Sequence, residues 1–168
     1  MFLHERVRRV RAALDEHGAA TEIVELPSPA PTAAAAAEQL GCPVGAIANS
    51  LVFAVDGAPL LVLTSGAHRV DTRLLAPFLG VSRNRIRRAA PEFVLAATGQ
   101  EVGGVAPVGH PLPIRALVDV TLSDYEHVWA GAGMHHSVFR TSFTELLTLT
   151  GGEPAVVSSE QTPSKQVL

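Results

Sequence analysis

Apolar positions in the first forty residues recur at helical spacing, then at strand spacing, then at helical spacing again. The first stripe consists of Leu3, Val7, Val10 and Leu14. This spacing predicts a helix that ends near Gly18, followed by a strand over residues 21–26. Prolines between 27 and 31 predict an extended link, after which Thr32 caps an alanine-rich helix closed by Gly41.

Two long apolar runs in the middle of the chain predict a β-hairpin over residues 49–55 and 59–64. Asp56-Gly57 between them is a favoured two-residue turn. Both runs are too apolar for strands with one wet face. We therefore expect them at the centre of a curled sheet or barrel.

The remaining pattern alternates short helices and strands without a regular βαβ rhythm. Helices are expected at 71–79, 90–98 and 142–150, and strands at 115–122, 127–132 and 137–141. Pro77 is expected to kink or shorten its helix. A further edge strand follows Gly152. The sequence thus predicts an α+β fold, with a mixed, mostly antiparallel curled sheet or barrel and surrounding short helices. We expect one domain over residues 1–160 and a flexible tail over 161–168.

Composition narrows the class of protein. The single cysteine excludes an internal disulfide and favours a reducing, cytoplasmic setting. No apolar run reaches about 18 residues, so no membrane span is expected. The net charge is −3, and the only lysine is Lys165. The densest basic run contains Arg83, Arg85, Arg87 and Arg88. This run, or the N-terminal arginines, is either a solvated face or a contact for nucleic acid.

Residues 99–111 contain four glycines and two prolines but also three valines. A glycine-rich loop of this apolar character lets backbone approach either a neighbouring strand or a ligand. Gly103 and Gly104 could turn backbone N–H groups towards a substrate oxygen. A tight packed turn is the structural alternative.

Several familiar chemistries find no support. The chain has no G-x-S-x-G and no Walker loop. Cys42 is either a nucleophile or, as is commoner, a small buried hydrophobe. Adjacent residues of a strand point to opposite faces, so His135 and His136 are not expected to share a metal. His68 and His110 at strand ends are candidate acids or bases, or simply hydrogen-bonding loop residues.

Four segments in order carry a resemblance to a known family: residues 49–53, 65–71, 103–109 and 129–133. They read NSLVF, SGAHRVD, GGVAPVG and WAGAG. This order resembles the YbaK/ProX superfamily, which comprises the editing domain inserted in bacterial prolyl-tRNA synthetase and its free-standing relatives. The resemblance covers residues 7–152. The glycine-rich loop and the later Gly-x-Gly indicate this family only when they occur together in this order.

The resemblance implies hydrolysis of the ester between a wrong amino acid and the 3′ end of a tRNA, without a metal or organic cofactor. It implies that Asn49, Gly103 and Gly104 act in catalysis. It implies substrate contacts from Ser50, His68, Val105, Pro107, Gly109, His110, Gly131, Ala132 and Gly133. The expected partner is the charged acceptor end of tRNA, with an aminoacyl-tRNA synthetase or elongation factor as a further partner, and no membrane. Alternatives are a catalytically silent module that binds the acceptor end or a synthetase, and a small-molecule esterase or amidase.

Asn49 departs from the family pattern, in which a lysine commonly begins this strand. Asparagine can orient a water, a carbonyl or a phosphate, but it brings no positive charge. The departure indicates a different substrate amino acid, slower turnover, or binding of tRNA without catalysis. Asn49 as a simple strand cap is the structural alternative.

Overall fold

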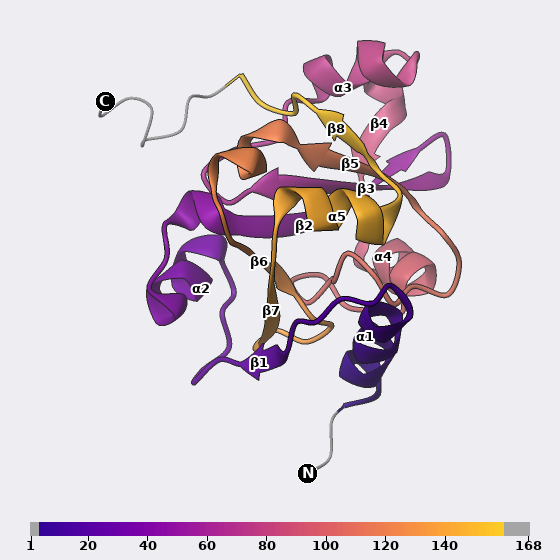
Figure 1. Ribbon diagram of the computed structural model, residues 1–168. Helices are drawn as coiled ribbons and strands as arrows, with labels where there is room; N and C mark the ends of the chain where they lie inside the picture. Colours follow the sequence, from indigo (N-terminus) through magenta and orange to yellow (C-terminus); the bar gives the residue numbers. More distant parts are fainter. Residues whose placement is uncertain (1–3, 160–168) are drawn as a thin grey trace.

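A computed structural model describes residues 4–159 (Figure 1). Eight strands form one mixed sheet, whose order is β1-β7-β6-β2-β3-β5-β8, with β4 paired to β2. The strands are β1 (Ile23–Glu25), β2 (Ile47–Val55), β3 (Ala58–Ser65), β4 (Ile86–Arg88), β5 (Arg115–Asp119), β6 (Val128–Gly131), β7 (Ser137–Thr141) and β8 (Glu153–Ala155). The α-helices are α1 (Glu5–Glu16), α2 (Ala33–Leu40), α3 (Thr72–Leu79), α4 (Pro91–Thr98) and α5 (Phe143–Thr150). Three short 3₁₀ turns are η1 (Val44–Ala46), η2 (Arg83–Arg85) and η3 (Val120–Asp124).

The β2–β3 hairpin lies at the centre of the sheet, as its apolar runs predict. It is antiparallel, turns at Asp56-Gly57, and is extended by parallel pairing of β3 with β5 and of β2 with β6. Antiparallel pairs join β1 to β7, β6 to β7 and β4 to β2. The predicted α+β class with a mixed, mostly antiparallel sheet is confirmed.

Helices cover both faces of this sheet, which explains why the central strands carry no polar face. The main core packs α1, α4 and α5 against one face, with Val10, Val94 and Leu146 among its buried residues. A second cluster packs α3 on the opposite face around Phe53 and Leu75. A third, smaller cluster packs α2 against β7 and the first residue of β2. Figure 1 shows α2 set apart from the other helices, beside β6 and β7.

Three local expectations differ from the structure. The strand expected over 115–122 ends at Asp119, because the Asp119 carboxyl accepts the Thr121 N–H and starts η3. Pro77 does not shorten its helix, which runs on to Leu79 and closes at Gly80 as the apolar pattern predicts. The arginine-rich run contains an unpredicted strand, β4, which pairs with the far end of β2.

Two of the sequence predictions concern the ends of the chain. Leu3 and the tail expected over 161–168 fall outside the described residues. Within residues 4–159, none of the helices has the length and apolar character needed to cross a membrane.

Candidate functional site

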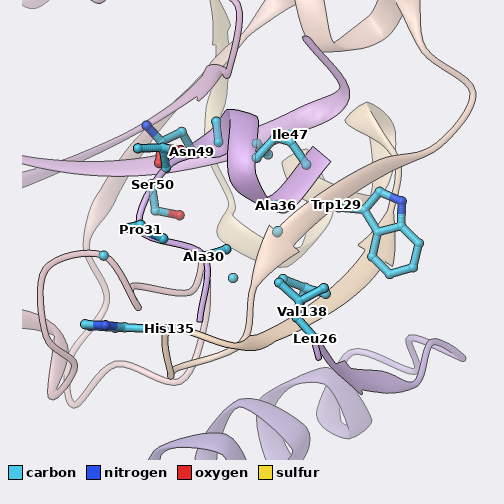
Figure 2. A pocket seen from close by; sticks show the side chains of 16 residues that line it. Leu26, Ala30, Pro31, Ala36, Ile47, Asn49, Ser50, Trp129, His135 and Val138 are labelled. Carbon is cyan, nitrogen blue, oxygen red and sulfur yellow. The ribbon is translucent and has the colours of Figure 1, made fainter. Parts of the chain in front are cut away.

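A cavity of about 120 Å³ opens where α2, the start of β2 and the β6–β7 turn meet (Figure 2). Its walls combine small apolar side chains with polar groups. They are formed by Leu26, Ala30, Pro31, Thr32, Ala33, Ala36, Ile47, Ala48, Asn49, Ser50, Gly103, Trp129, Ala130, Gly131, His135 and Val138. Of the predicted site residues, the structure brings together Asn49, Ser50, Gly103 and Gly131 here.

The edge of β2 is unpaired beside this cavity. β6 pairs with β2 only at Ile47 and Ala48, and β4 pairs only from Phe53 onward. On this edge the Val52 carbonyl accepts the Ala89 N–H at 3.1 Å. Backbone groups of alternate residues face the same edge of a strand. The N–H and C=O of Ser50 therefore face the gap between β6 and β4.

Two polar side chains accompany this open edge. Asn49 is exposed, and no side-chain hydrogen bond ties it to another described residue. The Ser50 hydroxyl is buried and has no hydrogen-bond partner within the described chain. A buried hydroxyl without a partner loses free energy unless a ligand or water satisfies it. Ser50 is thus the polar group of the cavity best prepared to receive a ligand.

The glycine-rich loop is held in shape by Gln100, a residue that the sequence analysis did not single out. Its side chain is 1% exposed and lies inside the loop, where Oε1 accepts the Ala106 N–H at 2.6 Å. Its Nε2 donates to the Val108 carbonyl at 3.3 Å. A buried amide that satisfies loop backbone on both sides fixes the loop without regular secondary structure. Its neighbours in the sequence do not signal this role.

Gly103 and Gly104 have different positions in this loop. Gly103 has a φ of +90°, which side chains rarely adopt, and it lines the cavity. The Gly104 N–H is donated to the Glu101 carbonyl at 2.9 Å, within a turn. Gly104 packs against the β6–β7 turn, where a Cβ would lie 3.2 Å from Met134 backbone atoms. The structure therefore places Gly103 in the cavity wall and Gly104 against the β6–β7 turn.

The remaining predicted glycines allow backbone segments to approach one another. A Cβ at Gly109 would lie 3.2 Å from Val10 of α1, and a Cβ at Gly133 would lie 3.0 Å from the Arg6 carbonyl. At Gly131 the nearest atom would be the Val105 carbonyl oxygen, at 3.0 Å. The loop, the turn and α1 thus form one packed unit behind the cavity. Val105, Pro107 and Ala132 are buried within or beside it.

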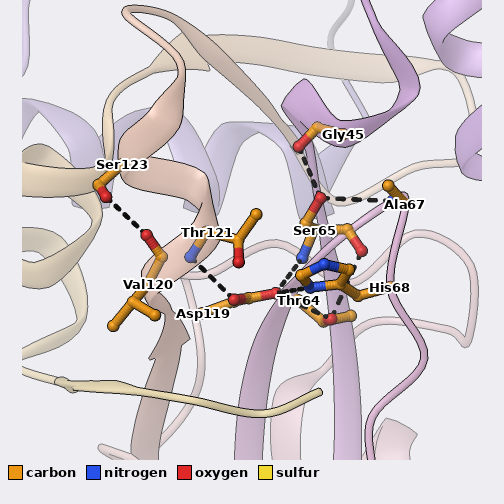
Figure 3. A network of polar contacts seen from close by, with 9 residues as sticks. All are labelled: Gly45, Thr64, Ser65, Ala67, His68, Asp119, Val120, Thr121 and Ser123. Atoms are coloured by element: carbon orange, nitrogen blue, oxygen red, sulfur yellow. Dashed lines mark hydrogen bonds and ion pairs between the residues drawn. The ribbon is translucent and has the colours of Figure 1, made fainter. Parts of the chain in front are cut away.

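His68 lies outside the cavity, in a buried polar network at the ends of β3 and β5 (Figure 3). Its Nδ1 is 3.0 Å from Asp119 Oδ2, and the two side chains are 3% and 2% exposed. The same oxygen accepts the Ser65 N–H at 3.0 Å, and the other carboxyl oxygen accepts the Thr121 N–H. This arrangement joins three segments of backbone and suits a structural role for His68.

His110 and Cys42 also lie away from the cavity walls. The His110 Nε2 is 2.8 Å from the Ala106 carbonyl, an acceptor, so this nitrogen carries the hydrogen. Burial lowers the pKa of His110, and the ring is neutral at neutral pH. Burial likewise raises the pKa of the Cys42 thiol, which disfavours the reactive thiolate. Cys42 packs in the α2 cluster.

His135 and Trp129 line the cavity although neither was assigned to the site from sequence. The sequence predicted His135 on a strand, but it lies in the turn between β6 and β7. Its carbonyl accepts the Ala30 N–H at 3.0 Å, and the next carbonyl, of His136, accepts the Leu26 N–H at 2.7 Å. In Figure 2 the His135 ring lies below Asn49 and Ser50. Among residues 4–159, no cluster of three or more His, Cys, Asp or Glu side chains is arranged to hold a metal ion.

Several known proteins are similar to this chain. A curated relative, the uncharacterized protein YwhH of Bacillus subtilis, is 27% identical over 83% of this chain and 88% of its own. A proline–tRNA ligase of Solidesulfovibrio magneticus is 30% identical over 68% of this chain, which spans only 21% of the ligase. A crystal structure of a candidate trans-editing enzyme for prolyl tRNA synthetase is 39% identical, with a TM-score of 0.88. That match covers 95% of this chain and 100% of the solved one.

The family model described as the aminoacyl-tRNA editing domain matches residues 27–149. This stretch contains the open edge of β2, the glycine-rich loop and the β6–β7 turn. The chain belongs to the aminoacyl-tRNA editing domain family.

Proposed function

We propose that this protein hydrolyses the ester between a small, wrongly attached amino acid and the 3′ end of a tRNA, acting in trans. The observation that carries the proposal is the unpartnered Ser50 hydroxyl beside an unpaired strand edge, next to a small cavity lined by small side chains and polar groups. A cavity of about 120 Å³ surrounded by small side chains suits an aminoacyl group with a small side chain.

The reaction needs positioning more than a covalent nucleophile, because an aminoacyl ester is already activated. The Ser50 N–H, the Ser50 hydroxyl and the Gly103 N–H are the donors that would stabilise the developing oxyanion. A water attacks the ester carbonyl, and the bond to the ribose oxygen breaks. The small side chains of Ala33 and Ala36 leave room for a small aminoacyl group and exclude larger ones by contact, as in an editing sieve.

Similarity to a free-standing solved protein supports action in trans. The solved candidate trans-editing enzyme is covered over its full length, whereas the S. magneticus ligase is covered over about a fifth. The tRNA acceptor end is the proposed partner. A synthetase or elongation factor that delivers the charged tRNA remains compatible with the same site.

A panel of tRNAs, each carrying a different amino acid, tests this proposal against the two alternatives. We expect rapid release of a small amino acid from charged tRNA and little attack on the corresponding free amino-acid ester. Tight binding of charged tRNA without release would instead support a silent binding module. Equal attack on simple esters would support a small-molecule esterase.

The first prediction concerns Asn49, the exposed amide at the mouth of the cavity. Asn49→Ala is expected to remove one or two hydrogen bonds that hold water or substrate in the transition state. At about 1.4 kcal/mol per bond, which is tenfold in rate, deacylation falls roughly ten- to a hundredfold. Asn49→Lys restores the residue common in the family and is expected to alter the preferred amino acid. An Asn49→Ala protein that deacylates its best substrate at the parental rate would reduce Asn49 to a strand cap.

The second prediction concerns the basic run. Arg85 is paired with Asp56, whereas Arg87 and Arg88 of β4 are exposed, with the Arg88 guanidinium 5.6 Å over the Phe53 ring. β4 follows the open edge along the same side of β2. We propose that Arg87 and Arg88 contact tRNA phosphates.

Replacing Arg87 and Arg88 together by Ala removes two phosphate contacts. The slope of log affinity against log salt is then expected to fall in magnitude by roughly 1.4 to 1.8. Arg115→Ala is the control, because Arg115 is exposed on another strand and paired with Glu153. An unchanged slope in the double variant would move the tRNA footprint elsewhere, for example to the N-terminal arginines.

A further inference from the structure

We propose that the imidazole of His135 is the proton-transfer group of this cavity. This inference rests on the proposed hydrolytic function and assigns a step in it to a residue outside the site predicted from sequence. Among the described residues that line the cavity, His135 is the only one with a titratable side chain. Asn49 and Ser50, the other strongly polar walls, can donate and accept hydrogen bonds but cannot take up a proton near neutral pH.

The backbone of His135 is held by hydrogen bonds of the turn, and the residue is exposed at the cavity. Its carbonyl accepts the Ala30 N–H at 3.0 Å, and the Ser137 N–H closes the turn on the Met134 carbonyl at 3.2 Å. The ring lies beside Gly103, where a Cβ would be 3.6 Å from Nε2. The imidazole edge thus faces the loop backbone that we propose binds the oxyanion. A base held beside the oxyanion site is well placed to reach an attacking water.

The charged groups around His135 come from three elements. Glu101 lies at the start of the glycine-rich loop, and Arg6 of α1 donates to its Oε1 at 2.7 Å. The hydrogen bond from Arg6 holds the pKa of Glu101 below its usual range, with smaller contributions from His135 and His4. His136 follows in the same turn. The Glu101 carboxylate is paired with Arg6, and no ion pair within 4 Å joins it to His135 among the described residues.

The step balances without any further reactant. Neutral Nε2 accepts a proton from the attacking water as the water oxygen bonds to the ester carbonyl carbon. As the bond from that carbon to the ribose oxygen breaks, the imidazolium returns the proton to the ribose oxygen. The products are the free amino acid and the tRNA 3′ hydroxyl, and the imidazole is neutral again.

The test compares His135→Gln with His136→Gln, a matched change one residue along the same turn. Single-turnover deacylation is measured from about pH 5.5 to 8.5, together with the affinity for a non-hydrolysable aminoacyl-tRNA analogue. A general base must be unprotonated to accept the proton, so the wild-type rate is expected to rise with pH and then level off. His135→Gln is expected to lose roughly 100- to 1000-fold in rate and to lose this inflection. Its affinity and thermal melt should match the wild type, and His136→Gln should stay within about twofold.

The outcomes separate this inference from the proposed function. If the wild type releases the amino acid and His135→Gln keeps the same rate and pH profile, the role of His135 is overturned but the proposed function is not. A lower rate with an unchanged inflection would do the same, because it would indicate packing and not proton transfer. Absence of release by the wild type across the tRNA panel would overturn both.

Discussion

Gly104→Val is expected to abolish deacylation, by about 100-fold or more, while the protein remains folded. A Cβ at Gly104 would lie 3.1 Å from His135 Cδ2 and 3.2 Å from Met134 backbone atoms. The larger Val side chain must therefore push the glycine-rich loop away from the β6–β7 turn. Misplacement of reacting groups by about 1 Å can cost 100-fold in rate.

The measurement is single-turnover release from charged tRNA, with the melting temperature as a check on folding. Overpacking of this kind costs about 1–3 kcal/mol of stability, which a domain of this size tolerates. Gly104→Ala should be intermediate. Val102→Ala is the control, because Val102 lies in the same loop and is 47% exposed. Full activity in a folded Gly104→Val protein would contradict the assignment of this loop to the site.

Asp119→Ala is expected to destabilise the protein by about 3–5 kcal/mol. The change leaves the Ser65 N–H, the Thr121 N–H and the His68 ring without their acceptor. It also removes one of the two acceptors of the Thr64 hydroxyl. Each buried polar group left unsatisfied costs about 1–3 kcal/mol. Urea unfolding at neutral pH gives the loss in free energy directly.

Asp15→Ala provides the matched control for that experiment. Asp15 accepts from Arg11 on an exposed helix face at 2.9 Å, a contact worth about 0.5 kcal/mol or less. A loss below about 1 kcal/mol in Asp119→Ala would mean that the His68 network does not hold the strand ends together.

The sequence predicted the central hairpin and most of the helices because their signals are local. Asp56-Gly57 specifies the turn, and the capping residues Thr32, Asp71 and Ser142 each accept a backbone N–H at a helix start. β4 was missed since only Ile86 of its three residues is buried, and its pairing with β2 is long-range. Strand partners distant in sequence leave little trace in local periodicity.

The candidate site was recovered only in part, for a related reason. A glycine indicates close approach but not what approaches, so Gly109 and Gly133, which face α1, read the same as Gly103, which faces the cavity. Gln100 and His135 were missed because their roles depend on the folded loop and turn. Their neighbours in sequence give no sign that one is buried within the loop and the other lines a cavity.

The most direct test of the central claim is the rate of amino-acid release from one tRNA carrying either a small or a large amino acid. With enzyme in excess, we predict release of the small amino acid at least about 100-fold faster than spontaneous hydrolysis, and release of the large one near the spontaneous rate. If the protein binds charged tRNA but every amino acid tested is released only at its spontaneous rate of hydrolysis, the account is contradicted.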